Sequence, residues 1–356
     1  MSSRIDRVMA ALGERGLKQM LVTDPRSIYY MTGISNHPGE RFYAFLMRAE
    51  GGHVLFANRL FNIPDNPYEM VWYTDTDPVM DYVSEYLDKS AVLGVDKDLK
   101  ARFLLPLMER GAAAGFVNAS LAVDLTRGIK DAEEQEKMRV SSLANDAVMA
   151  QLPALIHEGV TEKEVADEML ALYKAQGCTR YAFPPIVSFG ANAADPHHGP
   201  DGTVLKAGDV VLFDIGGVKD DYCSDMTRTF VYKEASEQNR EIYELVRRAN
   251  EAAEALIRPG VPICALDKAA RDLITEAGYG PNFNHRLGHF IGLDGHEFGD
   301  VSLTNETLAE PGMIFSIEPG IYLPGETGVR IEDLVLVTKD GVEILNHYSK
   351  ELTVIE

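Results

Sequence analysis

The chain has 356 residues, of which 46% are hydrophobic and 25% charged, a balance typical of folded globular proteins, and its length suggests about two domains. The net charge of −21 argues against a nucleic-acid partner, because proteins that bind nucleic acids present a basic surface to the phosphates.

The positions of the cysteines and the hydropathy of the chain argue against disulfide bonds, thiolate metal sites and membrane spans. Cys178, Cys223 and Cys264 lie far apart and form no CxxC pair, which argues against a disulfide framework or a thiolate metal site and fits a reducing compartment. No apolar run approaches the roughly 18 residues of a membrane span, and the first residues do not resemble a signal peptide. We therefore expect a cytoplasmic protein that makes no membrane contact.

The first 125 residues alternate between helical and extended patterns. Helices are predicted at residues 3–16, 24–33 and 77–87, and strands at residues 19–23, 42–47, 53–57 and 92–95. Such alternation indicates a small α/β domain. Its densest polar segment is the SNHPGER loop at residues 35–41, which includes Arg41 and has no evident partner within this domain.

The remaining residues, 126–356, are predicted to form a second domain with longer helices. Capping-box patterns at Asp131 and Thr161 predict helices that reach about residues 156 and 177, and strands then lead to Asp214. The same order of two helices followed by strands recurs from Ser236 onwards. An antiparallel sheet with its helices on one face buries the apolar side of both element types, so the predicted fold class is α+β.

Within this domain, residues 209–230 contain two apolar runs joined by a Gly/Asp-rich connection, a pattern that predicts a hairpin. Asp214 ends the first run, and Asp225 directly precedes the second. A carboxylate in an apolar strand costs several kcal/mol unless something pairs with it. Asp214 alone could be a solvated residue at a loop edge, whereas a metal ion would pair with both carboxylates.

An internal repeat favours the metal. GMIFSIEPG at residues 312–320 echoes GDVVLFDIG at residues 208–216, so that Glu318 corresponds to Asp214 and Glu332 corresponds to Asp225. Two facing hairpins would bring these four carboxylates together, and divalent cations would neutralise their repulsion. His289 and His296 lie between the halves in HRLGHFIGLDGHE. A ligand set of carboxylates and one histidine suits Mn²⁺ or Mg²⁺, with Co²⁺, Fe²⁺ and Zn²⁺ less favoured, and two such ions can activate water and polarise a carbonyl.

These motifs, together with DPHHGP and GVRIED, resemble the metallopeptidase family of prolidase, aminopeptidase P and methionine aminopeptidase. The resemblance implies a C-terminal pita-bread domain with a pseudo-twofold repeat, preceded by an N-terminal creatinase/prolidase-like domain, and it is greatest to compact bacterial Xaa-Pro dipeptidases. It departs from the family at Phe290, where Gly is usual, and at Phe298 or Gly299, where Pro is common, so the shape of the pocket is in question.

The resemblance also implies roles for individual residues. Two divalent ions, with Mn²⁺ favoured, would be held by Asp214, Asp225, His289, Glu318 and Glu332. Glu318 would also be the general base, and His197 and His296 would contact the substrate. Arg330 and Thr227 would hold ligand carboxylates in place, and Arg41 of a neighbouring chain in a homodimer would bind the substrate's carboxylate.

We therefore predict hydrolysis of the bond before proline in Xaa-Pro dipeptides. The alternatives are an Xaa-Pro aminopeptidase that acts on longer peptides, and a related metal-dependent amide hydrolase or lyase. A binding module without activity is disfavoured because all five ligand types are present. Creatinase, which works without this metal set, is disfavoured for the same reason, and methionine aminopeptidase by the additional N-terminal domain.

Overall fold

The computed structural model describes residues 3–356, which divide into two compact units at Arg127/Gly128. Within the described range, no helix is both long enough and apolar enough to cross a membrane.

The first unit is built on a six-stranded mixed sheet in the order β4-β3-β2-β1-β5-β6. Neighbouring strands are antiparallel at β1/β2 and β2/β3 and parallel at the other three pairings. The strands are β1 (Gln19–Val22), β2 (Ala44–Arg48), β3 (Val54–Asn58), β4 (Glu69–Tyr73), β5 (Val92–Val95) and β6 (Gly115–Asn118). The helices are α1 (Arg4–Glu14), α2 (Pro25–Thr32), α3 (Val79–Tyr86), α4 (Ala101–Glu109) and α5 (Ser120–Gly128).

The helix and strand patterns identified four of these strands and three of these helices. Side-chain caps explain two of the correct helix starts, because Ser3 accepts from the Asp6 amide and Asp24 accepts from the Ser27 amide. Helix α4 was missed, since Pro106 inside it is a helix-breaking signal. Strands β4 and β6 are short and largely half-buried or exposed, and they lack the alternation that predicts a strand.

The first half of the second unit begins with two helices, followed by strands. The helices are α6 (Ala132–Met149) and α7 (Glu162–Ala175), with the short 3₁₀ turns η1 (Leu152–Leu155) and η2 (Gly190–Ala194). The strands are β7 (Arg180–Tyr181), β8 (Ile186–Phe189), β9 (Val210–Ile215), β10 (Gly217–Lys219), β11 (Tyr222–Cys223) and β12 (Met226–Tyr232). Capping boxes at Asp131 and Thr161 start α6 and α7, as the sequence predicts.

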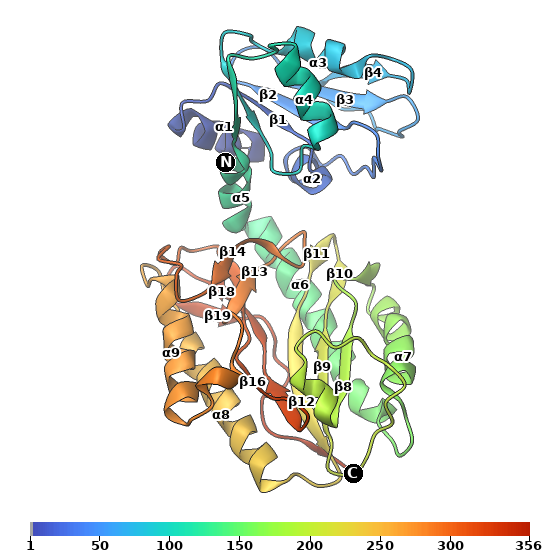
Figure 1. Cartoon of the computed structure of the whole chain (residues 1–356), viewed down its shortest axis with the longest axis vertical. Coiled ribbons are helices and arrows are strands. Elements are labelled where there is room, and N and C mark those ends of the chain that lie inside the picture. Colours follow the sequence, from blue (N-terminus) through green and yellow to red (C-terminus); the bar gives the residue numbers. More distant parts are fainter. Residues whose placement is uncertain (1–2) are drawn as a thin grey trace. The chain divides into compact units, whose positions relative to one another are not determined.

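The second half repeats this order. Its helices are α8 (Glu237–Glu254) and α9 (Ile263–Glu276), with η3 (Gly280–Asn282). Its strands are β13 (Gly288–Phe290), β14 (Glu297–Val301), β15 (Ile314–Ile317), β16 (Gly320–Leu323), β17 (Thr327–Arg330), β18 (Asp333–Val337) and β19 (Val342–Ile344), and β20 (Val354–Ile355) closes the chain. Figure 1 shows α8 and α9 on one side of the strands of this unit and α7 on the other side.

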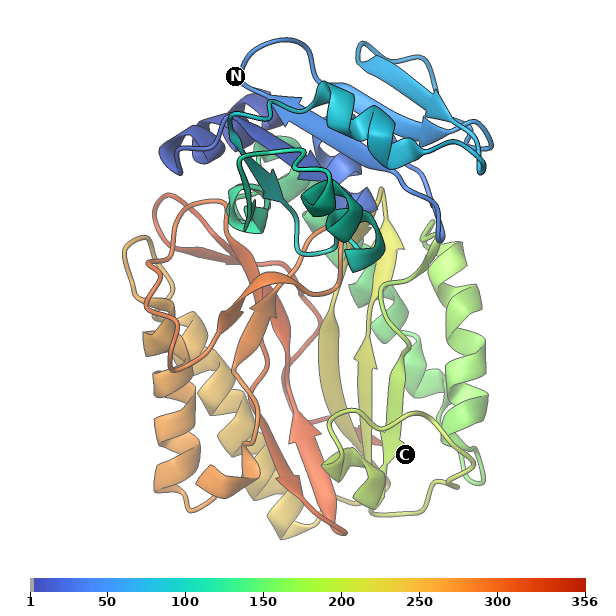
Figure 2. The ribbon, with the colours of Figure 1, turned by 45° about the horizontal axis from the view of Figure 1, so that its top comes forward.

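Each half has its own apolar core, between its helix pair and its strands. One core contains buried residues from Ala144 to Tyr232, and the other contains buried residues from Ile242 to Val337. The larger sheets have the strand orders β20-β12-β9-β8 and β14-β13-β15-β18-β19. Figure 2 shows the strands of both halves running between the flanking helices.

The paired strands of the repeat direct four acidic side chains to one place. In the first half β9 pairs antiparallel with β12, which sets Asp214 opposite Thr227. In the second half β15 pairs antiparallel with β18, and Glu318 and Glu332 directly flank the end of that pairing. The halves join where the Glu332 amide donates to the Thr227 carbonyl, 3.1 Å away. The predicted hairpin and repeat are therefore present.

Candidate metal centre and active site

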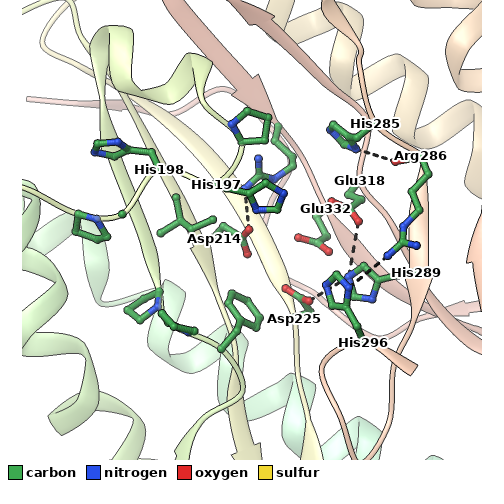
Figure 3. Close-up of a pocket in the computed structure, with 18 residues that line it drawn as sticks. His197, His198, Asp214, Asp225, His285, Arg286, His289, His296, Glu318 and Glu332 are labelled. Atoms are coloured by element: carbon green, nitrogen blue, oxygen red, sulfur yellow. Dashed lines mark hydrogen bonds and ion pairs between the residues drawn. The ribbon is translucent and has the colours of Figure 1, made fainter. Parts of the chain in front are cut away.

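The four carboxylates predicted from the repeat meet beside one histidine. Asp214 lies near the end of β9, Asp225 precedes β12, and Glu318 and Glu332 follow β15 and β17. Oxygen or nitrogen atoms of Asp225, His289 and Glu332 lie within 4.8 Å of one another. Figure 3 shows the four carboxylates and the imidazole directed at a common space.

His289 is oriented by contacts along β13. Its Nε2 lies 3.5 Å from Asp225 Oδ2 and 3.7 Å from Glu318 Oε1, while its Nδ1 lies 3.2 Å from the Phe290 carbonyl. Because a carbonyl only accepts, Nδ1 carries a proton, and Nε2 is the nitrogen that faces the carboxylates. Metal-ligating histidines commonly have this arrangement.

The electrostatics of the cluster favour a divalent cation. Burial first, and then repulsion from neighbouring carboxylates, raise the pKa of Asp225 and Glu332 well above the ordinary value, and burial raises that of Asp214. Among residues 3–356, Asp214 Oδ1 and Asp225 Oδ1 are also buried without a hydrogen-bond partner. Buried, unpartnered carboxylate oxygens that converge on one point fit metal ions and are costly without them.

Arg330 holds part of this cluster in place. Its guanidinium donates to Asp214 Oδ2 at 2.7 Å, to Thr227 Oγ1 at 3.0 Å and to the Tyr322 hydroxyl at 3.0 Å. Thr227 in turn donates to Glu332 Oε2 at 2.7 Å. Arg330 and Thr227 thus each contact one of the predicted ligand carboxylates, Asp214 and Glu332 respectively.

A cavity of about 670 Å³ opens over the cluster. One wall is apolar and includes Phe183, Pro184, Pro185 and Ile186, and the cavity is also lined by His197, His198, His285, Arg286 and His296. His197 and His296 are both exposed, and Figure 3 shows their rings near the carboxylates. The structure therefore brings both predicted substrate-contacting histidines to the cluster.

His296 is held by stacking and by an ion pair next to it. Its ring stacks on His289 with centroids 3.7 Å apart, and its Nδ1 lies 3.3 Å from the Arg286 guanidinium. Partial burial of the ring against the cavity wall, and the neighbouring His289, lower the pKa of His296 to about 4, so that the ring is neutral at neutral pH. Because Arg286 donates to Nδ1, the proton is on Nε2. The next residue, Glu297, forms a buried ion pair with Lys130 at 3.0 Å.

Sequence reasoning assigned no role to two polar residues of the site. His285 lines the cavity, and its Nε2 lies 2.9 Å from the hydroxyl of Tyr322, which Arg330 also contacts. Both residues stand within motifs used for the prediction, HRLGH and SIEPGIY. The sequence signal for them was their position four residues from the predicted ligands His289 and Glu318.

The departures from the family pattern lie outside the cavity lining. Among the described residues, Phe290, Phe298 and Gly299 are absent from that lining, and Phe290 instead belongs to the apolar core of the second half. The concern that these substitutions change the shape of the pocket therefore does not apply to its walls.

Arg41 lies in the first unit, where it already has a partner. Its guanidinium donates to both carboxylate oxygens of Asp75 at 2.8 Å, and it also lies 3.2 Å from Glu40. The premise that the SNHPGER loop has no partner in its own domain is wrong for this residue, because Asp75 is such a partner. Asp75 is 34 positions away, so the local sequence around Arg41 could not identify it.

Comparison with known proteins places the chain in a family. Residues 136–339 match the sequence model of metallopeptidase family M24. The chain belongs to metallopeptidase family M24. Residues 4–129 match the creatinase/prolidase N-terminal domain. The predicted family and fold class, an α+β pita-bread domain after a creatinase/prolidase-like α/β domain, are thereby confirmed.

Individual relatives of this M24 chain match it over nearly its whole length. An uncharacterized peptidase of Staphylococcus aureus strain MSSA476 is 38% identical, covering 98% of this chain and 100% of the relative. The crystal structure of dipeptidase PepE from Mycobacterium ulcerans has a TM-score of 0.92 at 34% identity, covering 99% of this chain and 97% of that one. The structure of an Xaa-Pro dipeptidase from Bacillus anthracis has a TM-score of 0.89 at 31% identity, covering 99% of both chains.

Proposed function

We propose that this M24 protein hydrolyses Xaa-Pro dipeptides with two divalent metal ions bound by Asp214, Asp225, His289, Glu318 and Glu332. The observation that supports this most is the convergence of these five side chains on the floor of a cavity with an apolar, proline-rich wall. The bound ions would act as Lewis acids that activate water and polarise the scissile carbonyl.

The protein groups have separate tasks in this proposal. Glu318 faces the cavity and receives the proton of the attacking water, while the Ser316 hydroxyl, 3.2 Å away, donates to its Oε1 and orients it. The N–H groups of His197 and His296 stabilise the oxyanion that develops from the carbonyl. Arg330 and Thr227 keep Asp214 and Glu332 in their binding orientations.

The cavity wall supports a preference for proline. A prolyl bond has no N–H to recognise, so a site that selects it depends on the shape of the ring. Phe183, Pro184, Pro185 and Ile186 offer an apolar surface for a pyrrolidine ring next to the metal ligands. A volume of about 670 Å³ is within the range of small-molecule sites.

One observation favours the alternative of an Xaa-Pro aminopeptidase. A second cavity of about 350 Å³ shares Pro184, Pro185 and Pro200 with the first and extends along α7. It offers room for residues beyond a dipeptide.

Peptide length distinguishes the two functions. With Mn²⁺ added, we expect Xaa-Pro dipeptides to be cleaved at least about tenfold faster in kcat/KM than Xaa-Pro-Xaa tripeptides, a difference of roughly 1.4 kcal/mol in transition-state binding. Asp225→Ala should lose both ions in elemental analysis, because the family resemblance assigns Asp225 to both ions. Equal cleavage of both lengths would indicate the aminopeptidase, and full metal content in Asp225→Ala would contradict the ligand assignment.

A further inference from the structure

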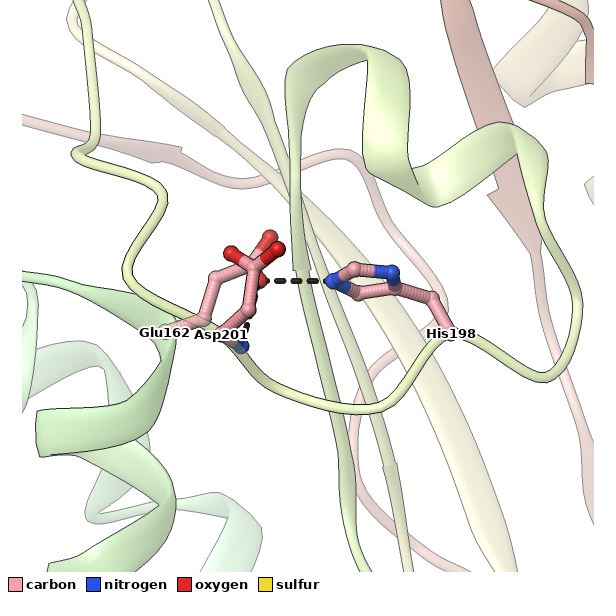
Figure 4. A group of neighbouring side chains, drawn as sticks. All are labelled: Glu162, His198 and Asp201. Atoms are coloured by element: carbon pink, nitrogen blue, oxygen red, sulfur yellow. Dashed lines mark hydrogen bonds and ion pairs between the residues drawn. The ribbon is translucent and has the colours of Figure 1, made fainter.

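A second group of ionisable side chains lies beside the metal centre, at the start of α7. Ligand atoms of Glu162, His198 and Asp201 lie within 4.8 Å of one another (Figure 4). The spacing alone would suit a metal ion. The hydrogen bonds around Glu162 indicate a different role.

The Glu162 carboxylate is fully buried and accepts four hydrogen bonds. Its Oε1 accepts from the Phe189 amide at 2.7 Å and from Asn192 Nδ2 at 2.9 Å. Its Oε2 accepts from His198 Nε2 at 2.7 Å and from the Asp201 amide at 3.1 Å. Four donors satisfy both oxygens, so a metal ion could bind there only by displacing them.

All four donors belong to one segment, residues 189–201, which contains η2 and the DPHHGP motif. Two backbone hydrogen bonds also join the helix to this part of the chain. The Glu162 amide donates to the Thr203 carbonyl at 3.2 Å, and the Lys163 amide donates to the Asp201 carbonyl at 3.0 Å. First-turn amides of a helix have no partner within the helix. The start of α7 is therefore hydrogen-bonded to the loop both before and after the loop's two histidines, His197 and His198.

The two adjacent histidines of this loop point in different directions. Figure 3 shows His197 directed toward the carboxylates and His198 turned away, and Figure 4 shows His198 directed toward Glu162. Asp195 fixes the turn before them, since its Oδ1 accepts from the His197 amide at 3.0 Å. Fixing the ring of His198 thus restricts the backbone from which His197 projects.

We propose that Glu162 is a positioning residue that, through His198 and the loop amides, holds His197 over the metal centre. The role of His197 in this inference rests on the proposed function. The attachment of the loop to Glu162 does not, so the two can be tested separately.

Hydrogen exchange tests the attachment without any substrate. Glu162→Gln keeps the size of the side chain but replaces one of its two acceptor oxygens by an NH₂ donor, so whichever of the Phe189 and Asp201 amides faces the NH₂ should exchange at least about tenfold faster. Glu164→Gln is the matched control, since Glu164 lies in the same helical turn and its side chain, among residues 3–356, accepts hydrogen bonds from Thr161 and not from the loop. Equal exchange in the two variants would overturn the proposal.

A double-mutant cycle tests the action through His197. Glu162→Gln and His198→Ala should each lower kcat for an Xaa-Pro dipeptide about tenfold or more, with unchanged metal content, and should cause no further loss when His197→Ala is present. If Glu162→Gln does not fold, His198→Ala alone completes the cycle. Additive losses, or loss of a bound ion in His198→Ala, would overturn the proposal.

Failure of the proposed function gives a different result. If the wild-type enzyme cleaves no Xaa-Pro dipeptide, the dipeptidase proposal fails, whereas the exchange experiment still decides whether Glu162 anchors the loop. The kinetic cycle is then measured on whichever peptide the enzyme cleaves.

Discussion

In the second half of the catalytic domain, the ring of Phe290 fills the space that a side chain at Gly299 would need. The ring of Phe290 packs on Phe315 with centroids 5.4 Å apart, and a Cβ at Gly299 would lie 2.7 Å from Phe290 Cδ2. Gly299 also has a φ of +114°, a region that disfavours side chains. Phe290, one departure from the family pattern, is therefore packed against Gly299, one of the two candidate positions for the other departure, and the missing side chain at Gly299 leaves room for the phenylalanine ring.

This contact predicts that the two residues are coupled energetically. Gly299→Ala should lower the free energy of unfolding through both backbone strain and the clash with the ring. Phe290→Ala should itself cost about 3–5 kcal/mol, because it leaves a cavity. In the Phe290→Ala background the clash is absent, so Gly299→Ala should cost about 1–3 kcal/mol less than in the wild type. Denaturant unfolding of the four proteins measures the difference.

Gly295→Ala is the control for this cycle. A Cβ at Gly295 would lie 3.8 Å from its nearest neighbour, the Ala182 carbonyl oxygen, and this position has no positive φ, so little change in stability is expected. Equal costs of Gly299→Ala in both backgrounds would mean that backbone strain alone accounts for the effect.

At this scale the sequence predicted the residues that belong to motifs and missed those that depend on distant partners. The repeat indicated Asp214 and Glu318 because each ends an apolar run, and Asp225 and Glu332 because each precedes the next strand. The ion pair of Lys130 with Glu297 spans 167 positions, and neither partner has a local pattern that predicts the other.

At the scale of elements, a buried ionic cluster connects α8, β12, β18 and the C-terminal segment. Arg228 donates to Asp333 Oδ1 at 2.7 Å and to the Glu332 carbonyl at 2.6 Å. Lys350 lies 2.7 Å from both Asp333 and Glu254. The cluster therefore holds the strand that follows Glu332, a proposed metal ligand.

Glu254 makes the stability of this cluster depend on pH. Burial, and then repulsion from Asp333, raise its pKa from 4.5 to about 7 despite the opposing attraction of Lys350. The protonated form is thus favoured in the folded state, and its stabilising contribution is present below the unfolded value near 4.5 and is lost as the pH rises through 7. Relative to Glu254→Gln, the wild type should lose about 3 kcal/mol of unfolding free energy between pH 4.5 and 7.

Unfolding midpoints of both proteins across this pH range measure the effect. The contributions of titratable groups common to both proteins cancel when the two unfolding free energies are subtracted. Glu251→Gln, on the same helix but half exposed and paired with Arg247, should run parallel to the wild type. A constant difference between Glu254→Gln and the wild type would show that Glu254 stays ionised in the fold.

The elements themselves were predictable where capping and periodicity agree. Capping boxes at Asp131 and Thr161 gave the starts of α6 and α7, and apolar runs gave β9 and β12. Strand β4, with only one fully buried residue, owes its place to pairing with β3, a contact that a local pattern does not encode.

At the scale of the whole molecule, we propose that the chain forms a homodimer in which Arg41 of one chain serves the active site of the other. The Arg41 guanidinium can bind a carboxylate through two hydrogen bonds, as it does with Asp75. A substrate carboxylate would have to compete with Asp75 for the same donors. Light scattering at micromolar concentration should give twice the monomer mass, and a monomer would contradict the proposal.

Mixing two impaired variants tests the exchange of Arg41 between chains. Arg41→Ala should weaken dipeptide turnover and leave metal content unchanged, and Asp225→Ala should abolish metal binding. If Arg41 acts across the dimer, a mixed dimer places both lesions in one site and leaves the other site intact. Random mixing after reversible dissociation makes about half of the dimers mixed, so about a quarter of the sites should recover wild-type turnover. If Arg41 acts within its own chain, each site of a mixed dimer carries one lesion, and mixing restores none of the lost activity.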